Sequence, residues 1–307
     1  MYGEWNKQAF TDVFEHEKML ADRVRVDAYA QAIDRLVGPT DVVVDLGTGT
    51  GILAMLAARR ARRVYAIDHS PFIDVAERIA AHNGFTNITF VQEHSTTFQP
   101  SEPVDVVLHE QMGDELLNEN MLDNLLDLKQ RVVAEDGRIL PGRFEFFVEP
   151  VALVEDRQVP FLWDMQVHGI DFGFLRGDPA VSANTRKSYG YRRVSTGDVA
   201  HSLGVPAPVL SFDLATLHQV DEVPRDLTVP RQVTTDGWFD GFCIWFRAHF
   251  DDRTVLSTSP LEARTSWTNR LVRTPRRKVG AGETIRYRVQ LHDLVRPGTW
   301  TIAEEDG

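Results

Sequence analysis

Two glutamates, Glu110 and Glu119, stand nine residues apart and bracket the segment HEQMGDELLNENML. This separation does not place both side chains on one face of a helix, where neighbouring side chains are three or four residues apart. It suits instead the two arms of a loop that folds back on itself. Two converging carboxylates bind a planar cation through paired hydrogen bonds, and guanidinium is the biological cation with that geometry. The alternative is an ordinary acidic surface loop, since Glu115 lies there too.

A glycine-rich turn, VVVDLGTGTG, precedes this segment by about sixty residues. Gly47, Gly49 and Gly51 allow a tight turn and let a ligand approach the main chain closely. A dinucleotide fingerprint would have Gly or Ala where this chain has Ile52. Asp45, at the end of the preceding strand, would repel a pyrophosphate and attract an amino-acid ammonium group. The turn therefore predicts an S-adenosylmethionine site, with a nicotinamide site or a turn without a ligand as alternatives.

The elements that must position these residues alternate between strand and helix. Short apolar runs predict strands at 42–45, 64–68, 88–91 and 104–108. Helical composition predicts helices at 51–60 and 72–83. This alternation is typical of a parallel sheet covered by helices. Asp68 would end the second strand and suit the ribose hydroxyls of a nucleoside. The glutamate segment would lie just past the C-terminal edge of the sheet, where open α/β sheets bind ligands.

The second half of the chain has a different pattern from about residue 140 onward. Strand-like runs separated by turn signals occupy 144–154, 232–250, 284–291 and 299–303. They predict an antiparallel β domain, either a barrel or a sandwich. Between the first two runs, residues 171–208 are polar and contain Gly, Pro and Ser, as expected for a long linker or for an excursion that contacts a partner.

The bulk composition limits the function classes. The 307 residues predict about two domains. A net charge of -12 argues against nucleic-acid binding and favours cationic partners. No apolar run approaches the roughly 18 residues of a membrane span, so no membrane partner is expected. The N-terminus has no signal-peptide pattern and Cys243 is the single cysteine, which predicts a cytoplasmic protein without an internal disulfide.

Several segments together resemble the protein arginine N-methyltransferase family. They are HEKMLADRVR at 16–25, VVVDLGTGTGIL, VYAIDHS, the glutamate segment, and LSTSPLEARTSW at 256–267. The resemblance implies an S-adenosyl-L-methionine-dependent enzyme with a class I methyltransferase Rossmann-like sheet and an antiparallel β-barrel-like domain. It divides the chain into a helical cap at 1–36, a cofactor-binding domain at 37–141 and a substrate domain at 142–307. A dimerisation arm at about 171–208 would form a homodimer.

The resemblance also implies roles for individual residues. Those expected at the cofactor are His16, Met19, Arg25, Asp45, Gly47, Gly49, Asp68 and Ser95. Within this set, Arg25 would pair with the methionine carboxylate and Asp68 would bind the ribose. Glu110 and Glu119 would hold the guanidinium as the catalytic pair. Met19 and Met112 would line the substrate channel, and Ser266 and Trp267 would also contact the substrate. The reaction implied is a methyl displacement that needs no metal.

The departures from the family pattern fall around the substrate and the adenine. Ser266 stands where the family has a histidine, so Asp22 lacks that partner. Ser95 replaces a glutamate near the adenine, and Gln111 replaces a tryptophan. The tyrosines of the family's N-terminal element are replaced near Asn6 and Phe10. These changes leave three hypotheses: methylation of arginine in proteins or peptides, methylation of a small molecule such as free arginine, and a binding homologue without catalysis.

Overall fold

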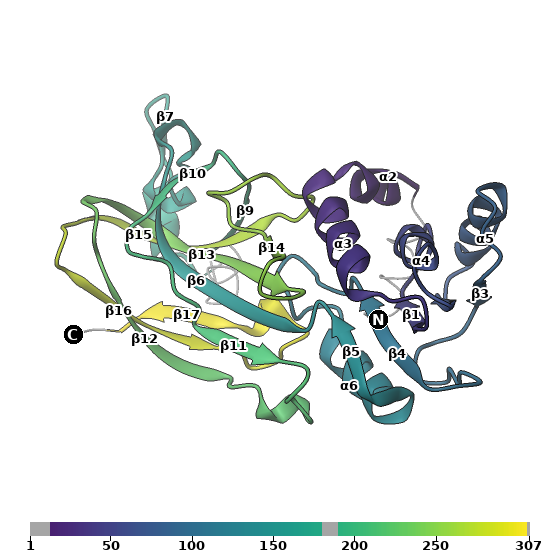
Figure 1. Cartoon of the computed structure of the whole chain (residues 1–307). Coiled ribbons are helices and arrows are strands. Elements are labelled where there is room, and N and C mark those ends of the chain that lie inside the picture. Colours follow the sequence, from purple (N-terminus) through teal and green to yellow (C-terminus); the bar gives the residue numbers. More distant parts are fainter. Residues whose placement is uncertain (1–12, 180–189, 306–307) are drawn as a thin grey trace. The chain divides into compact units, whose positions relative to one another are not determined.

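The computed structural model describes residues 13–179 and 190–305 of the chain, which fold into two compact units (Figure 1). The first unit contains the described residues up to Glu145, together with Ser211–Val223 and Arg247–Ser257. The second contains the described residues of Phe146–Leu210, Pro224–Phe246 and the segment from Thr258 onward.

A five-stranded parallel sheet forms the centre of the first unit. Its order is β3-β2-β1-β4-β5, and every neighbouring pair is parallel. The strands are β1 (Val42–Leu46), β2 (Arg63–Ile67), β3 (Ile88–Val91), β4 (Val104–His109) and β5 (Val133–Leu140). All five residues of β1 are buried, as expected for a central strand covered on both faces. The strand order reverses between β1 and β4, and ligands of open α/β sheets bind at such a point.

The described residues of the same unit form five α-helices (Figure 1). They are α2 (Val13–Ala21), α3 (Arg23–Leu36), α4 (Ile52–Ala58), α5 (Ile73–His82) and α6 (Met121–Arg131). The glycine-rich turn joins β1 to α4, and the glutamate segment joins β4 to α6. Both predicted site segments therefore leave the C-terminal ends of neighbouring strands. Within the described part of the chain, no helix is long and apolar enough to cross a bilayer.

The segment at 16–25, which resembles one helix of the family, forms parts of two helices here. The main chain of Asp22 is extended, with φ of -74° and ψ of 90°, and this ends α2. The carboxylate of Asp22 then accepts a hydrogen bond from the main-chain nitrogen of Arg25, at 3.0 Å. Asp22 is therefore the N-cap of α3, a role that suits its short acidic side chain.

Antiparallel strands build the second half of the chain, as predicted. One sheet follows the order β10-β6-β13-β15-β9, with β11 paired to β6 and β14 to β13; another has the order β12-β16-β17. The strands are β6 (Arg143–Leu153), β9 (Tyr191–Val194), β10 (Val199–Ser202), β11 (Leu210–Asp213), β12 (Asp226–Gln232), β13 (Gly237–His249), β14 (Val255–Ser257), β15 (Asn269–Val279), β16 (Thr284–Gln290) and β17 (Thr301–Glu304). Aromatic side chains fill the core of the second unit, where Phe147 stacks on Trp245 with ring centroids 3.7 Å apart.

A carboxylate and a guanidinium are buried together in the second unit. Arg231 Nη2 donates to Glu149 Oε1 at 2.7 Å and to the carbonyl oxygen of Ala207 at 2.8 Å. The main-chain nitrogen of Ala207 donates to the same Glu149 oxygen at 3.0 Å. Burial raises the pKa of Glu149 to about 7, while the charge of Arg231 opposes this rise. The Glu149–Arg231 pair thus fixes the loop between β10 and β11 by hydrogen bonds to the main-chain nitrogen and the carbonyl oxygen of Ala207.

The polar stretch at 171–208 contains sheet strands as well as connecting segments. β9 pairs with β15 and β10 pairs with β6. Residues 180–189 lie outside the described part of the chain. Large exposed apolar side chains occur just before and at the start of this stretch, in and around the hairpin of β7 (Gln166–Val167) and β8 (Ile170–Asp171). They are Val159, Leu162, Val167, Ile170 and Phe174.

Candidate active site

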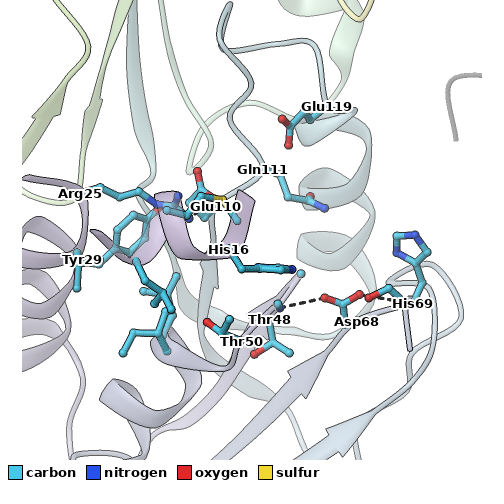
Figure 2. Close-up of a pocket in the computed structure, with 18 residues that line it drawn as sticks. His16, Arg25, Tyr29, Thr48, Thr50, Asp68, His69, Glu110, Gln111 and Glu119 are labelled. Atoms are coloured by element: carbon cyan, nitrogen blue, oxygen red, sulfur yellow. Dashed lines mark hydrogen bonds and ion pairs between the residues drawn. The ribbon is translucent and has the colours of Figure 1, made fainter. Parts of the chain in front are cut away.

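A cavity of about 150 Å³ lies in the first unit, where the helices α2 and α3, the glycine-rich turn and the loop after β4 meet (Figure 2). Eight of the residues predicted for the site line it: His16, Met19, Arg25, Gly47, Gly49, Asp68, Glu110 and Glu119. The fold therefore brings together residues from four separate sequence segments. Their individual roles stay predictions.

The glycine-rich turn adopts a main-chain conformation that favours glycine. Gly47, Gly49 and Gly51 have φ angles of 73°, 51° and 80°. A Cβ atom on Gly49 would lie 3.0 Å from Cε1 of His16. The imidazole of His16 is buried and stacks on Phe72, with ring centroids 4.0 Å apart. Gly49 can therefore lie against the His16 ring only because this position has no side chain.

Asp68 is held in a fixed orientation at the end of β2. Its Oδ2 accepts from the main-chain nitrogen of Gly49 at 3.0 Å, and its Oδ1 accepts from that of Ser70 at 2.8 Å (Figure 2). A carboxylate fixed in this way at the cavity wall is suited to accept hydrogen bonds from a ribose diol.

Asp45 lies beneath the turn rather than on the cavity wall. Its Oδ2 accepts from Thr48 Oγ1 at 2.6 Å and from the main-chain nitrogen of Ala54 at 2.9 Å. Burial raises the pKa of Asp45 to about 6, and these hydrogen bonds oppose the rise. Asp45 therefore braces the turn against the first residues of α4. Its predicted contact with a ligand ammonium group stays a prediction.

The two glutamates of the opening motif reach the cavity from opposite ends of their loop. Glu110 follows β4 directly, and Glu119 lies two residues before α6. Burial raises the pKa of Glu110 to about 7. Burial, followed by the charges of Glu110 and Asp114, raises the pKa of Glu119 to about 8. Two partly buried carboxylates that repel one another form a site where a cation relieves an existing electrostatic cost.

Arg25 partly compensates the negative charge of this site, because its positive charge opposes the rise in the pKa of Glu110. Its guanidinium forms an ion pair with Glu110, and both side chains are largely buried, with exposed fractions of 12% and 14%. One helical turn later, the hydroxyl group of Tyr29 donates to the carbonyl oxygen of His109 at 2.6 Å. Two consecutive turns of α3 are thus attached to the end of β4. Tyr29 was not among the residues predicted for the site, although its spacing of four residues from Arg25 puts both on one helix face.

Besides Asp45, four of the predicted residues do not line this cavity. Ser95 is buried, and its carbonyl oxygen accepts from Arg131 Nη2 at 2.7 Å. Met112 is also buried, with an exposed fraction of 2%. Ser266 and Trp267 belong to the second unit, where Trp267 packs edge-to-face on Phe246. The contacts predicted for these residues stay predictions.

Other residues line the cavity without having been given a role in it. Gln111 reaches the cavity beside Glu110, and its Oε1 accepts from Nδ2 of Asn124 at 3.2 Å (Figure 2). Thr50, His69 and Ser70 line the cavity next to the glycine-rich turn and Asp68. These three residues lie within the motifs VVVDLGTGTGIL and VYAIDHS, and that position was the only sequence signal for a place at the cavity. The predicted departures near Asn6 and Phe10 lie outside the described residues.

Comparisons with known proteins agree with this arrangement. Residues 43–137 match a family of methyltransferase domains. The chain is 31% identical over 270 residues to protein arginine N-methyltransferase 6 of Danio rerio, covering 84% of this chain and 76% of that protein. It is 32% identical over 294 residues to protein arginine N-methyltransferase 1 of Schizosaccharomyces pombe, covering 88% and 79%.

Solved structures show the same architecture. The Trypanosoma brucei PRMT1 enzyme–prozyme heterotetrameric complex with AdoHcy matches with a TM-score of 0.78 and 26% identity, over 92% of this chain and 89% of that one. Protein arginine methyltransferase 10 of Arabidopsis thaliana matches with a TM-score of 0.75 and 22% identity, over 92% and 88%. The fold expected from the sequence, a Rossmann-like sheet followed by an antiparallel β domain, is confirmed.

Proposed function

The chain belongs to the protein arginine N-methyltransferase family, whose cofactor is S-adenosyl-L-methionine, and from this premise we propose that it methylates the guanidinium group of arginine in proteins or peptides. The observation that supports this proposal is that Glu110 and Glu119 line the same cavity as the glycine-rich turn. The turn and Asp68 would hold the nucleoside part of the cofactor. The two glutamates would hold the guanidinium beside it.

The glutamates act by localising charge. Bound S-adenosyl-L-methionine supplies a methyl group on a sulfonium. Free guanidinium has a pKa of about 13.8, so it is protonated and its nitrogens are poor nucleophiles. Glu110 and Glu119 draw the positive charge toward the nitrogens that they contact, which leaves the remaining nitrogen able to direct its lone pair at the methyl carbon. Positioning and electrostatics in a buried site each contribute several kcal/mol to such a reaction.

The product must lose one proton for each methyl group transferred. A carboxylate whose pKa lies near the working pH is suited to accept a proton. Burial and the charges of Glu110 and Asp114 raise the pKa of Glu119 to about 8, so Glu119 meets this requirement. We therefore place the proton acceptor at Glu119 in the proposed mechanism, in the absence of the family's histidine at Ser266.

Methyl transfer with labelled cofactor tests the proposed function directly. The full chain is incubated with Arg-Gly peptides or with free arginine, and the products are identified by mass. We expect transfer to arginine side chains in the peptides, with loss of transfer in Glu110→Gln and in Glu119→Gln. Glu77→Gln, an exposed glutamate on α5, is the matched control. Normal activity of both glutamate variants would sink the mechanism.

Free L-arginine is the second candidate substrate. The observation that favours it is Gln111, whose polar amide reaches the cavity where the family pattern has a tryptophan. A polar wall suits a small guest that carries its own ammonium and carboxylate. Turnover of peptides but not of free arginine in the same assay removes this candidate. A single turnover of either substrate also removes the hypothesis of a homologue without catalysis.

We propose that the chain forms a homodimer through the exposed apolar side chains at 159–174. Large apolar groups that gather on one surface segment commonly mark an interaction site. One solved relative is a heterotetrameric complex, which is consistent with assembly through such a surface. Sedimentation analysis of a variant with Ile170→Asp and Phe174→Asp tests this proposal, and we expect it to be monomeric. A variant that sediments as the wild type does would contradict it.

A further inference from the structure

We infer that Asn118 is a positioning residue of the guanidinium site: its side chain holds together the two arms of the loop after β4 and so sets the separation of Glu110 and Glu119. This inference rests on the proposed function. Asn118 does not line the cavity, and the family resemblance gave it no role. It acts through the two glutamates and does not touch the substrate.

The loop that carries the two glutamates folds back on itself at its centre. Gly113 and Leu116 form an isolated antiparallel bridge, and the main-chain nitrogen of Leu116 donates to the carbonyl oxygen of Gly113 at 2.8 Å. The main-chain nitrogen of Leu117 donates to the carbonyl oxygen of Glu115 at 2.7 Å. Such short-range bonds are typical of tight turns. They define the tip of the loop, and they leave its two arms to be joined by other contacts.

Asn118 makes a contact between the two arms. Its Oδ1 accepts a hydrogen bond from the main-chain nitrogen of Glu115 at 3.2 Å. Its carboxamide also packs against Gly113, where a Cβ atom would lie 2.2 Å from Oδ1 and 2.5 Å from Cγ and Nδ2 of Asn118. The φ of Gly113 is outside the left-handed region, so this position needs glycine for the space that Asn118 fills. The contact lies three residues after Glu110 and directly before Glu119.

The arm that leads to Glu119 contains main-chain strain on both sides of Asn118. Leu116 and Asn120 have φ angles of 65° and 56°, in the left-handed region that residues other than glycine rarely adopt. The strain falls mainly on Leu116, because asparagine tolerates this region better. Strained positions persist only where the surrounding contacts hold them. The Leu116 side chain is fully buried, and Asn118 supplies a polar contact on the same arm. Loss of the Asn118 side chain should therefore let this arm relax.

The separation of the arms matters because both glutamates must contact one guanidinium. Paired contacts to a planar cation depend on geometry, and a displacement of about 1 Å can cost about 10²-fold in rate. Asn118→Ala removes both the hydrogen bond from Glu115 and the packing on Gly113. We expect its kcat/KM for an Arg-Gly peptide to fall by about 10- to 100-fold. Its affinity for S-adenosylhomocysteine, measured by calorimetry, should stay at the wild-type value.

A second substitution tests the contact itself. In Gly113→Ala the added methyl group must expel the Asn118 carboxamide, so this variant should lose as much kcat/KM as Asn118→Ala does. The double variant should be no worse than either single variant, because the three atoms nearest to the new methyl group are then gone. Such non-additivity is the signature of two residues in contact. The matched control is Asn83→Ala, an exposed asparagine that donates to the carbonyl oxygen of Ile79, and it should keep the wild-type kcat/KM.

The pH profile separates positioning from a general loss of stability. Burial, followed by the charges of Glu110 and Asp114, raises the pKa of Glu119 to about 8, and the charge of Arg25 opposes this rise. If the arms separate, the repulsion from Glu110 weakens, so the inflection in kcat/KM near this pH should move to lower pH in Asn118→Ala. Asn118→Asp keeps the acceptor and the shape of the side chain but adds a negative charge beside Glu119. Its inflection should move to higher pH, and most of the wild-type kcat/KM should return above it. A variant that is merely destabilised would lose activity without moving the inflection.

Failure of this inference can be told apart from failure of the proposed function. If the wild type methylates the peptide and Asn118→Ala keeps its kcat/KM, the positioning role is wrong and the function stands. Additive losses in the double variant would also overturn the inference. If Asn118→Ala is too unstable to assay, an unmoved inflection in Asn118→Asp overturns it. If the wild type transfers no methyl group to peptides or to free arginine, the proposed function fails and the inference falls with it.

Discussion

Among the described residues, two glutamate–arginine pairs are largely buried, one in each compact unit, and they differ in what they face. Glu110 with Arg25 and Glu149 with Arg231 are both ion pairs, and burial raises the pKa of both glutamates to about 7. The first pair lines a cavity. The second pair forms hydrogen bonds with the main-chain nitrogen and the carbonyl oxygen of Ala207, so these partners come from the protein and not from a ligand.

The difference shows that a perturbed buried carboxylate does not by itself mark a functional site. Perturbed groups gather at active sites, but structural ion pairs perturb pKa values as well. What distinguishes the two pairs is access to a ligand. We therefore expect changes to the cavity pair to affect activity, and changes to the second pair to affect stability.

The largest effect should come from breaking the structural pair. Arg231→Met leaves the Glu149 carboxylate without its counter-charge and the Ala207 carbonyl without its donor, so the free energy of unfolding should fall by about 3–5 kcal/mol. Urea denaturation measures this loss. Adding Glu149→Leu should recover part of it, because both buried charges are then gone. Loss of methyl transfer at wild-type stability would contradict the structural role.

Neutralising a cavity glutamate should lower activity without lowering stability, in contrast to Arg231→Met. Glu119→Gln removes one charge from the guanidinium site, and kcat/KM should fall by about 10²–10³-fold, as for loss of one group that stabilises charge in a buried active site. The free energy of unfolding should not fall, since this buried carboxylate is repelled by Glu110 and Asp114. Steady-state kinetics measures the expected fall in kcat/KM, and urea denaturation measures the free energy of unfolding. A destabilised variant with full activity would place Glu119 with the structural groups.

The pH dependence of activity should report the cavity pair. Burial raises the pKa of Glu110 to about 7 and that of Glu119 to about 8, so both carboxyl groups hold protons below these values and lose them above. Binding of a cation needs the charged forms. The kcat/KM of the free enzyme should therefore rise with pH through about 7 to 8 and then level off. Glu119→Gln should lose the upper inflection, and a flat wild-type profile would exclude this assignment.

The smallest effect should come from Asp45, which lies next to the cavity but bonds the chain. Asp45→Asn should lower the free energy of unfolding by about 1 kcal/mol, because hydrogen bonds from Thr48 and Ala54 are weakened. Calorimetry of S-adenosylhomocysteine binding should show a smaller loss of affinity than for Asp68→Asn. The reverse order would show that Asp45 contacts the ligand.

The sequence predicted the central strands well because they are buried on both faces and appear as short apolar runs. The strand predicted at 42–45 is one residue shorter than β1, and that at 104–108 is one residue shorter than β4. β5 was not predicted, since its sequence VAEDGRIL contains a turn-like Asp-Gly pair and is partly exposed at the edge of the sheet. Partial exposure alone did not conceal a strand, because β3 at the opposite edge is also partly exposed and was predicted at 88–91. The turn-like Asp-Gly pair is what distinguishes β5.

The same limit applies to the site. Motif spacing sufficed to place Glu110, Glu119 and Asp68 near one edge of the sheet. The sequence could not show that Arg25 pairs with Glu110, because the two residues are 85 positions apart and meet only through the tertiary fold. Asp22 was expected to lack its family partner, and the structure instead gives it the N-cap of α3. Local capping competes with any distant partner for the same carboxylate.

The attachment of α3 to β4 has a consequence for how the chain folds. The hydrogen bond from Tyr29 to His109 and the ion pair from Arg25 to Glu110 join residues 80 and 85 positions apart. Contacts between such distant residues form slowly, since a long loop must close before they bring any gain. During synthesis, α3 leaves the ribosome well before β4 does. The wall of the cavity that carries Arg25 is therefore among the parts of the first unit that must wait for later-made sequence before they can dock.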